Sequence, residues 1–368
     1  MARVTVYISS VGSGGGERVG VFVAGALAAA GYEVDLAVAT FAGVLAGDPV
    51  VQAHGVNLGG GEFNVRNLLR HVRERKPDLL IAIGRSAKIV AGIVHQIEPT
   101  LRWVPSIHGV LSRPRLQRFW LRMLFGYAPE RWLYRRAIAF HAISPQVAAQ
   151  VVRNFAVSAD RVRVIANPVT LERTTATAPD IPGLDLSRPF IVTAGRLAPE
   201  KAQHRLITAF AQSGLAGRVQ LLILGEGSLR RRLERQARNL GLAQDVIFGG
   251  FVANVRPLLQ RSAGFALSSM HEALPLVLIE ALDAGVPVAS FDCPVGPREI
   301  LDQGRLGRLI AQRDVEGLAR AMTDMVEGRL SARSPAAVAQ HLARFAPDLI
   351  AREYVAFVED CLQADVPA

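Results

Sequence analysis

The chain has 368 residues and a formal net charge of +10 at pH 7, and 50% of its residues are hydrophobic. That apolar fraction excludes a mainly disordered chain, and the length suits two domains of ordinary size. The two cysteines, Cys293 and Cys361, exclude a disulfide scaffold and show no paired metal-ligand spacing.

Apolar runs typical of strands alternate with helical patterns along the first half of the chain. Strands are expected at residues 4–9, 34–39, 79–83, 137–143 and 162–165, and helices at residues 18–30 and 68–75. Strands rich in Val, Ile and Leu that alternate with helices indicate a parallel sheet covered on both faces.

Residues 170–188 are rich in Thr, Ala, Pro and Asp, which marks an interdomain linker. The alternation then restarts, with strands expected at residues 190–194, 219–224, 246–248, 265–267 and 287–290, and helices at 201–211, 229–240 and from about 276. We therefore expect an α/β protein with two Rossmann-like domains facing a central cleft, where ligands favour the carboxyl ends of the strands. The expected divisions are residues 1–170, 171–346 and a final amphipathic helix within 347–368.

The N-terminus reads as a strand that runs into a glycine loop, and not as a signal peptide. The uncharged stretch near it, residues 19–32, is too short to cross a bilayer. We expect a cytoplasmic protein, either free or peripheral on a membrane surface.

The excess positive charge is confined to the first half of the sequence. Residues 1–170 contain 20 Lys and Arg against 10 Asp and Glu, whereas residues 171–368 contain 22 of each class. This asymmetry indicates an anionic partner: a phosphate, an acidic membrane or a nucleic acid. The alternative is a generally arginine-rich surface, since the chain has 39 Arg and 3 Lys.

A glycine-rich loop at residues 12–17 follows the first strand and opens a helix. Glycines there allow backbone N–H groups to approach a phosphate at the positive end of a helix. Glu17 occupies the place of the third glycine of the dinucleotide fingerprint, and no P-loop lysine follows. The loop therefore indicates either a phosphate contact or a plain tight turn.

Two segments of the second half carry candidate chemistry. Arg196 and Lys201 follow the strand at 190–194 and supply a planar guanidinium and a compact ammonium for phosphate oxygens. In the segment 271–280, Glu272 precedes a helix, and Glu280 lies within that apolar helix. A carboxylate in such surroundings needs polar partners, for which sugar or ribose hydroxyls are suitable. The backbone N–H groups at the helix start suit a diphosphate.

The Gly-Arg-Leu-x-x-x-Lys segment at 195–201, followed by Glu-x7-Glu at 272–280, resembles glycosyltransferase family 4, retaining nucleotide-sugar enzymes of the GT-B fold. Further motifs fit in order over nearly the whole chain: Gly14-Gly-Gly-Glu-Arg18, Ile107-His108-Gly109, Ser144-Pro145, Asn167-Pro168-Val169, Gly225-Glu-Gly227, Gly249-Gly-Phe251 and Gly296-Pro-Arg-Glu299. The resemblance implies an N-terminal acceptor domain, a C-terminal donor domain and a last helix that returns to the N-terminal domain.

The resemblance also implies roles for individual residues. Arg196 and Lys201 match the cations that neutralise the donor diphosphate without a metal, and the chain has no Asp-x-Asp pair. Glu280 matches the residue that binds the donor ribose, and Glu272 matches the one near the transferred sugar. No cofactor or metal is expected.

The remaining donor contacts implied by the resemblance come from both halves. Backbone around Leu274 and Leu276 would meet the diphosphate, and Val252 would lie by the base. His108 matches a histidine close to the donor sugar, for which a core histidine is the alternative. Gly15 and Gly16 would lie across the cleft from the phosphates.

The expected reaction is transfer from a nucleotide-sugar, with UDP-sugar as the first choice, and retention at the anomeric carbon. Preorganised cations would stabilise the charge on the leaving diphosphate. The family often has Gly where this chain has Ala202, and Gly-Phe where it has Ala273-Leu274. Alanine is accommodated at these positions if the backbone avoids positive φ.

The stretch from Arg113 to Arg136 interleaves arginines with aromatic residues at helical spacing. An anionic membrane surface would suit such a pattern, with candidate contacts at Arg113, Arg115, Arg118, Trp120 and Arg122. Together with the resemblance, this favours a lipid-linked or polysaccharide acceptor of the cell envelope. The alternative is that Trp120 and Trp132 pack in the core while the arginines are solvated.

Two other functions remain as alternatives. A non-catalytic polyanion-binding protein would use the basic first half with steep salt dependence, although no nucleic-acid motif is present and no nucleic acid is expected. A nicotinamide-dependent oxidoreductase is disfavoured by the incomplete glycine fingerprint.

Overall fold

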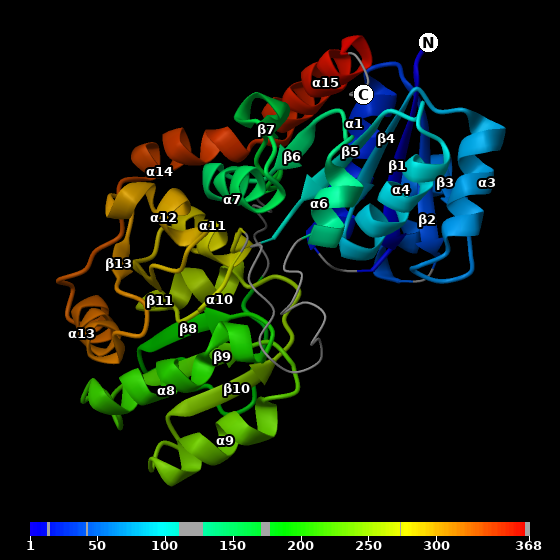
Figure 1. The fold of residues 1–368 in the computed structure, drawn as a ribbon. Helices are drawn as coiled ribbons and strands as arrows, with labels where there is room; N and C mark the ends of the chain where they lie inside the picture. The colour runs from blue at the N-terminus through cyan, green and yellow to red at the C-terminus, as the bar shows by residue number, and fades with distance from the viewer. Residues whose placement is uncertain (13–14, 42, 110–127, 171–176, 273, 365–368) are drawn as a thin grey trace. The chain divides into compact units, whose positions relative to one another are not determined.

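The computed structural model describes residues 1–12, 15–41, 43–109, 128–170, 177–272 and 274–364 (Figure 1). The chain divides into two compact units: unit 1 comprises Met1–Pro168 and Phe345–Ala368, and unit 2 comprises Val169–Arg344. Both divisions fall close to the expected boundaries at 170/171 and 346/347. Across the described ranges, every helix is too short or too polar to span a bilayer.

Unit 1 is built on a seven-stranded parallel sheet of order β3-β2-β1-β4-β5-β6-β7. Its strands are β1 Arg3–Ser10, β2 Glu33–Thr40, β3 Gly55–Asn57, β4 Leu79–Ile83, β5 Trp103–Ile107, β6 Phe140–Ala142 and β7 Val162–Val164. Its helices are α1 Gly15–Ala29, α2 Pro49–His54, α3 Val65–Arg75, α4 Arg85–Ile97, α6 Ala128–Tyr134, α7 Pro145–Phe155 and α15 Pro347–Gln363.

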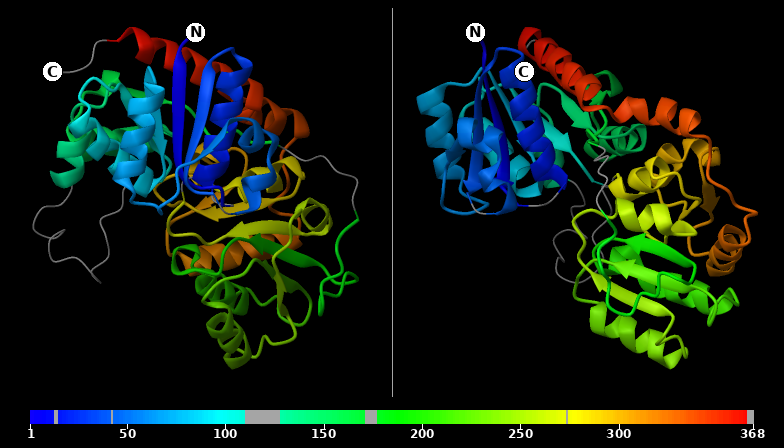
Figure 2. Two further views of the ribbon diagram at one scale, coloured as in Figure 1. Left: turned by 90° about the vertical axis from the view of Figure 1, so that its right-hand side faces the viewer. Right: turned by 180° about the vertical axis from the view of Figure 1, so that it is seen from behind.

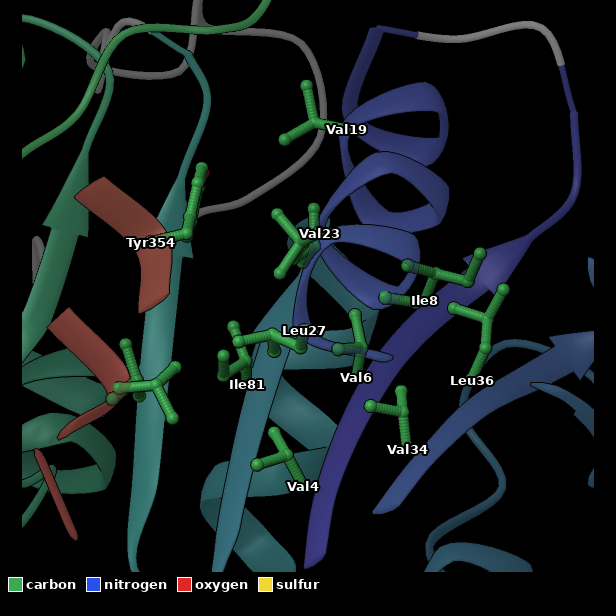
Figure 3. Packing of buried hydrophobic residues seen from close by; sticks show 14 of the residues in the cluster. Val4, Val6, Ile8, Val19, Val23, Leu27, Val34, Leu36, Ile81 and Tyr354 are labelled. Atoms are coloured by element: carbon green, nitrogen blue, oxygen red, sulfur yellow. The ribbon is translucent and has the colours of Figure 1, made fainter. Parts of the chain in front are cut away.

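The core of unit 1 lies between this sheet and helices α1 and α15, which contact each other. Figure 3 shows Val23 and Leu27 of α1 directed toward Val6 of β1 and Ile81 of β4. Gly20 permits this approach, because a Cβ there would overlap the side chain of Ile8. Helices α3 and α4 pack on each other outside this cluster.

Helix α15 is the last element of the chain, yet it belongs to unit 1. In both views of Figure 2 it lies, in red, alongside the elements of that unit. Its buried residues Ile350, Tyr354, Phe357 and Val358 recur at helical spacing and join the core cluster. The amphipathic pattern of α15 therefore explains its position, because the helix buries its apolar face in the core of unit 1.

Unit 2 contains a six-stranded parallel sheet of order β10-β9-β8-β11-β12-β13. Its strands are β8 Phe190–Ala194, β9 Gln220–Leu224, β10 Val246–Gly250, β11 Gly264–Leu267, β12 Val288–Phe291 and β13 Arg308–Ile310. Its helices are α8 Gln203–Gln212, α9 Arg230–Asn239, α10 Arg256–Arg261, α11 Leu276–Asp283, α12 Pro297–Ile300, α13 Val315–Val326 and α14 Pro335–Leu342. Leu206 of α8, Leu233 of α9 and Leu318 of α13 share one core with the strands.

Local signals account for several helix starts. Asn64, Ser144 and Asp314 each accept a hydrogen bond from a backbone N–H in the first turn of α3, α7 and α13. These side chains satisfy donors that a helix start otherwise leaves free.

Candidate functional site

The strand order of unit 2 reverses direction between β8 and β11, which creates a topological switch point. The chain leaves β8 toward β9 on one side, and leaves β11 toward β12 on the other. The loops at the carboxyl ends of these two strands therefore diverge, and ligands of open α/β sheets bind at such a place. These loops carry Gly195–Lys201 and Ser268–Pro275, the two segments singled out in the sequence.

Lys201 and Glu272 form an ion pair across this switch point. The Lys201 ammonium donates to Glu272 Oε1 at 2.7 Å and to Oε2 at 2.8 Å. The Glu272 side chain is only 7% exposed and that of Lys201 is 23% exposed. Burial of either charge without its partner would be costly, so the pair depends on both residues being present.

Backbone interactions fix the two loops against each other. Ser268 Oγ donates to the Lys201 carbonyl at 3.0 Å, and the Met270 N–H donates to the Glu200 carbonyl at 2.8 Å. Ala202, directly after the lysine, has φ 49° in the left-handed region. The condition for accommodating alanine without strain, a backbone that avoids positive φ, is therefore not met, and the Cβ costs about 1 kcal/mol relative to an unstrained conformation.

Arg196 lies on the same loop in more open surroundings. Its side chain is 71% exposed and pairs with Glu200 Oε1 at 2.6 Å. A surface pair of this kind is worth little, so the guanidinium can exchange Glu200 for another anion at small cost. Gln203 fixes the loop itself, because its amide donates to the Arg196 carbonyl at 2.9 Å.

Neighbouring loops at the same sheet edge are joined by backbone hydrogen bonds. The Gly195 N–H donates to the Leu224 carbonyl at 2.9 Å, and the Gly225 N–H donates to the Gly250 carbonyl at 2.6 Å. Gly225 has φ 123°, and a Cβ there would collide with the carbonyl of Gly195. The Gly-Glu-Gly motif thus lets two loops approach more closely than other residues allow.

The remaining candidates in unit 2 follow β10 and β11. Leu274 and Leu276 are half-buried at the start of α11, and Pro275 precedes its first turn. Glu280 is half-buried one turn further along, and Val252 is half-buried in the loop after β10. The first turn of α11 contains no acidic residue, which leaves its backbone N–H groups suited to an anion.

Cys293 is buried in unit 2 and is not suited to nucleophilic chemistry. Burial, together with the negative charge of Glu272, raises the pKa of its thiol to about 12. Its Sγ donates to the Val295 carbonyl at 3.4 Å. A thiol in this state is a small core residue.

At the carboxyl edge of the unit 1 sheet, His108 directly follows β5 and is half-buried. Its Nε2 lies 2.6 Å from Ser106 Oγ, and its Nδ1 lies 3.1 Å from the Asn167 side chain. Desolvation and the nearby His141 lower the pKa of His108 well below its ordinary value. The imidazole is therefore neutral at physiological pH.

His141 extends this polar chain into the core. Its Nε2 lies 2.9 Å from the Ile165 carbonyl, its Nδ1 lies 2.5 Å from Ser106 Oγ, and Tyr354 of α15 contacts its ring. Burial lowers the pKa of His141 to about 4, so the ring is neutral. Because Nε2 must donate to the carbonyl, Nδ1 accepts the Ser106 hydroxyl proton.

The Asn167 contact bears on the tautomer of His108. Its Nδ1 lies 3.1 Å from Asn167 Oδ1, which is an acceptor, so Nδ1 of the neutral ring carries the proton and donates to that oxygen. Nε2 of His108 and Nδ1 of His141 are therefore both acceptors that face the single hydroxyl proton of Ser106. Sequence analysis missed Ser106, His141 and Tyr354, because no spacing rule links residues so far apart in the chain.

Comparison with known families decides the identity of the chain. Residues 175–341 match the model described as glycosyl transferases group 1, and residues 13–173 match that of glycosyltransferase family 4. Together the two models cover nearly the whole of both units. The chain is a GT-B glycosyltransferase of the family 4 type.

Relatives of this glycosyltransferase include enzymes of surface-polysaccharide synthesis. A lipopolysaccharide core biosynthesis glycosyltransferase of Rhizobium meliloti, LpsE, is 29% identical over 85% of this chain and 86% of its own. Lipopolysaccharide 1,6-galactosyltransferase of Salmonella typhimurium is 29% identical over 51% of this chain and 52% of its own, so that match spans about half of the relative.

Solved structures confirm the GT-B fold. HepE of Anabaena in complex with UDP-glucose has a TM-score of 0.78 at 22% identity, covering 98% of this chain and all of that one. The apo form of the lipopolysaccharide outer core galactosyltransferase WaaB has a TM-score of 0.76 at 19% identity, covering 98% of this chain and 99% of that one.

The structure brings some of the predicted residues of this glycosyltransferase together and leaves others undescribed. Lys201 and Glu272 are in contact, whereas Gly15 and Gly16 lie in the first turn of α1, ahead of the expected helix start at residue 18. The candidate membrane contacts at Arg113, Arg115, Arg118, Trp120 and Arg122 lie outside the described residues. Trp132 on α6 is 52% exposed, so the alternative that it packs in the core is wrong.

Proposed function

We propose that this glycosyltransferase moves a sugar from a UDP-sugar, without a metal and with retention of anomeric configuration, onto a lipid-linked or polysaccharide acceptor of the cell envelope. The observation that carries the proposal is the Lys201–Glu272 pair at the switch point of unit 2. The UDP-glucose complex of HepE and the lipopolysaccharide transferases among the relatives support the choice of donor and acceptor.

The donor diphosphate would bind between these cations and α11. Lys201 has three N–H donors, of which two engage Glu272, so one remains for a phosphate oxygen. Arg196 would exchange Glu200 for another phosphate oxygen, and the first turn of α11 would contribute backbone N–H groups. Glu280 would accept hydrogen bonds from the ribose.

The reaction breaks the bond between the anomeric carbon and the diphosphate oxygen. An acceptor hydroxyl forms the new bond on the same face and transfers its proton to an oxygen of the departing diphosphate. Negative charge grows on that diphosphate in the transition state, where Lys201 and Arg196 would stabilise it. Glu272 would hold the lysine in place and lie beside the transferred sugar.

Sugar transfer from a panel of UDP-sugars to envelope lipid extract, in the presence of EDTA, tests the proposal. One donor should give product, and 1H NMR should show the donor's anomeric configuration in it. Lys201→Ala should lower kcat by about 10²–10³-fold, as for loss of one transition-state donor. Glu280→Gln should raise the KM for the donor, and Lys76→Ala, at an exposed position, is the matched control.

A product of inverted configuration, or activity that disappears with EDTA and returns with Mg²⁺, would contradict the proposed mechanism. Binding that depends steeply on salt and needs no nucleotide would instead favour the polyanion-binding function.

A further inference from the structure

Unit 1 contains a buried lysine that none of the proposed chemistry uses. Lys88 lies in the first turn of α4, directly after β4, and is only 9% exposed. The sheet of unit 1 changes direction between β1 and β4, so this turn borders a second topological switch point. Ligands of open α/β sheets usually bind at such a position.

The Lys88 ammonium has no anionic partner in the described part of the chain. No hydrogen bond or ion pair of this group is present there, and the charged neighbour that acts on it is Arg85, another cation. The positive end of α4 adds a further unfavourable contribution.

The same group acts on the histidines of unit 1. Desolvation is the main cause of the lowered pKa values of His108 and His141, and the charge of Lys88 lowers both further. His108 follows β5, the strand beside β4, so Lys88 and His108 lie at one edge of the sheet. Neither histidine can balance the charge of the lysine, because an imidazole is either neutral or cationic.

An uncompensated ammonium buried to this degree is unfavourable, and burial lowers the pKa of Lys88 to about 8. The backbone N–H groups in the first turn of α4 have no partners within the helix, and they lie at its positive end, which favours anions. A bound phosphate or carboxylate would therefore accept hydrogen bonds from the charged Lys88 ammonium and from neutral backbone N–H groups. These groups together form a site for an oxyanion.

We propose that Lys88 and the first turn of α4 bind an oxyanion, phosphate or carboxylate, carried by the acceptor. This assignment rests on the proposed function, in which Lys201 and Arg196 of unit 2 already take the donor diphosphate. Lys88 would then select acceptors with an acidic group and help to place their hydroxyl for transfer.

The chain has three lysines, Lys76, Lys88 and Lys201, so selective labelling with 13C-lysine gives a spectrum in which each can be followed. Lys76→Arg and Lys88→Arg identify the signals. In UDP-saturated protein, inorganic phosphate or acetate should raise the titration midpoint of Lys88 by about one pH unit. The midpoint of exposed Lys76 should stay constant.

If neither phosphate nor acetate changes the titration midpoint of Lys88, the proposal of an oxyanion site is overturned. A midpoint that rises with UDP alone and no further with phosphate overturns the acceptor assignment, because the donor is then the ligand. If calorimetry detects no UDP binding while phosphate still moves Lys88, the proposed function fails and the oxyanion site stands.

Phosphate affinity provides a second measurement on variants. Lys88→Gln should weaken phosphate binding by the UDP-saturated protein about 10- to 100-fold, the effect of losing one hydrogen bond to a charged group. Lys76→Gln is the control and should bind as wild type does. Equal phosphate affinity of Lys88→Gln and Lys76→Gln would overturn the proposal.

Discussion

Lys201 and Glu272 show how two charges can be held together at the switch point of the unit 2 sheet. Each satisfies the other, and their loops are joined by the Ser268 and Met270 hydrogen bonds. A ligand with negative charge can share the lysine without leaving the carboxylate unpaired. Under the proposed function, the pair would therefore be preorganised for the donor diphosphate.

Removal of one partner should destabilise the protein more than removal of both. Lys201→Met leaves the buried Glu272 carboxylate without a cation, which should lower the free energy of unfolding by about 3 kcal/mol. Lys201→Met with Glu272→Leu should recover most of this loss, because no unpaired charge remains. Urea unfolding followed by circular dichroism measures both variants. A double variant as unstable as the single one would show that the pair is not coupled in this way.

Individual candidate residues could be selected from the sequence, but their mutual arrangement could not be predicted. Lys201 and Glu272 stood out through their positions after strands, whereas their direct contact depends on the strand order. The positive φ of Ala202 was missed because only the loop geometry reveals it. Ser106 and His141 were missed because their link is a hydrogen bond between neighbouring strands.

At the scale of elements, strands and helices with strong patterns were predicted well. The expected strand at 4–9 is β1, and that at 190–194 is β8. The strand β5 was missed, since Pro105 in an interior strand argues against strand structure. It is accommodated because β6 pairs only with Ser106 and Ile107, beyond the proline.

The contact between β6 and α15 should depend on pH through His141. The pKa of this residue is about 4 in the folded protein, below its ordinary 6.5. Between these values the unfolded chain binds more protons, so the free energy of unfolding should fall as pH falls from about 6.5 to 4. Above about pH 6.5, the free energy of unfolding should no longer depend on the titration of His141. The ring of Tyr354 on α15 packs against this neutral imidazole.

Melting temperatures measured across this pH window test the expectation. His141→Gln should show a shallower loss of stability on acidification than wild type, even if it is less stable at pH 7. Tyr354→Phe keeps the imidazole and should retain the steep loss, which makes it the matched control. Parallel curves for wild type and His141→Gln would exclude His141 as the titrating group.

At the scale of the whole molecule, the division of charge changes when the chain folds. Residues 345–368 carry one Arg and five Asp or Glu, and they belong to unit 1. Unit 1 therefore has a net charge of +6 and unit 2 of +4, a smaller contrast than the two halves of the sequence suggest. Arg163 of β7 pairs with Asp360 of α15 within unit 1. Attraction of an anionic partner is thus better argued from local sites than from this asymmetry.

Metal-free binding of UDP is the most direct test of the central claim that unit 2 is a nucleotide-sugar donor site built on Lys201. Calorimetric titration of the protein with UDP, GDP and ADP in EDTA should show one-site binding of UDP. Affinity should fall at least tenfold in Lys201→Ala and stay unchanged in Lys76→Ala, since loss of one charge-assisted hydrogen bond costs about 1.5–3 kcal/mol. Absence of binding by all three nucleotides, or equal UDP affinity in Lys201→Ala, would contradict it.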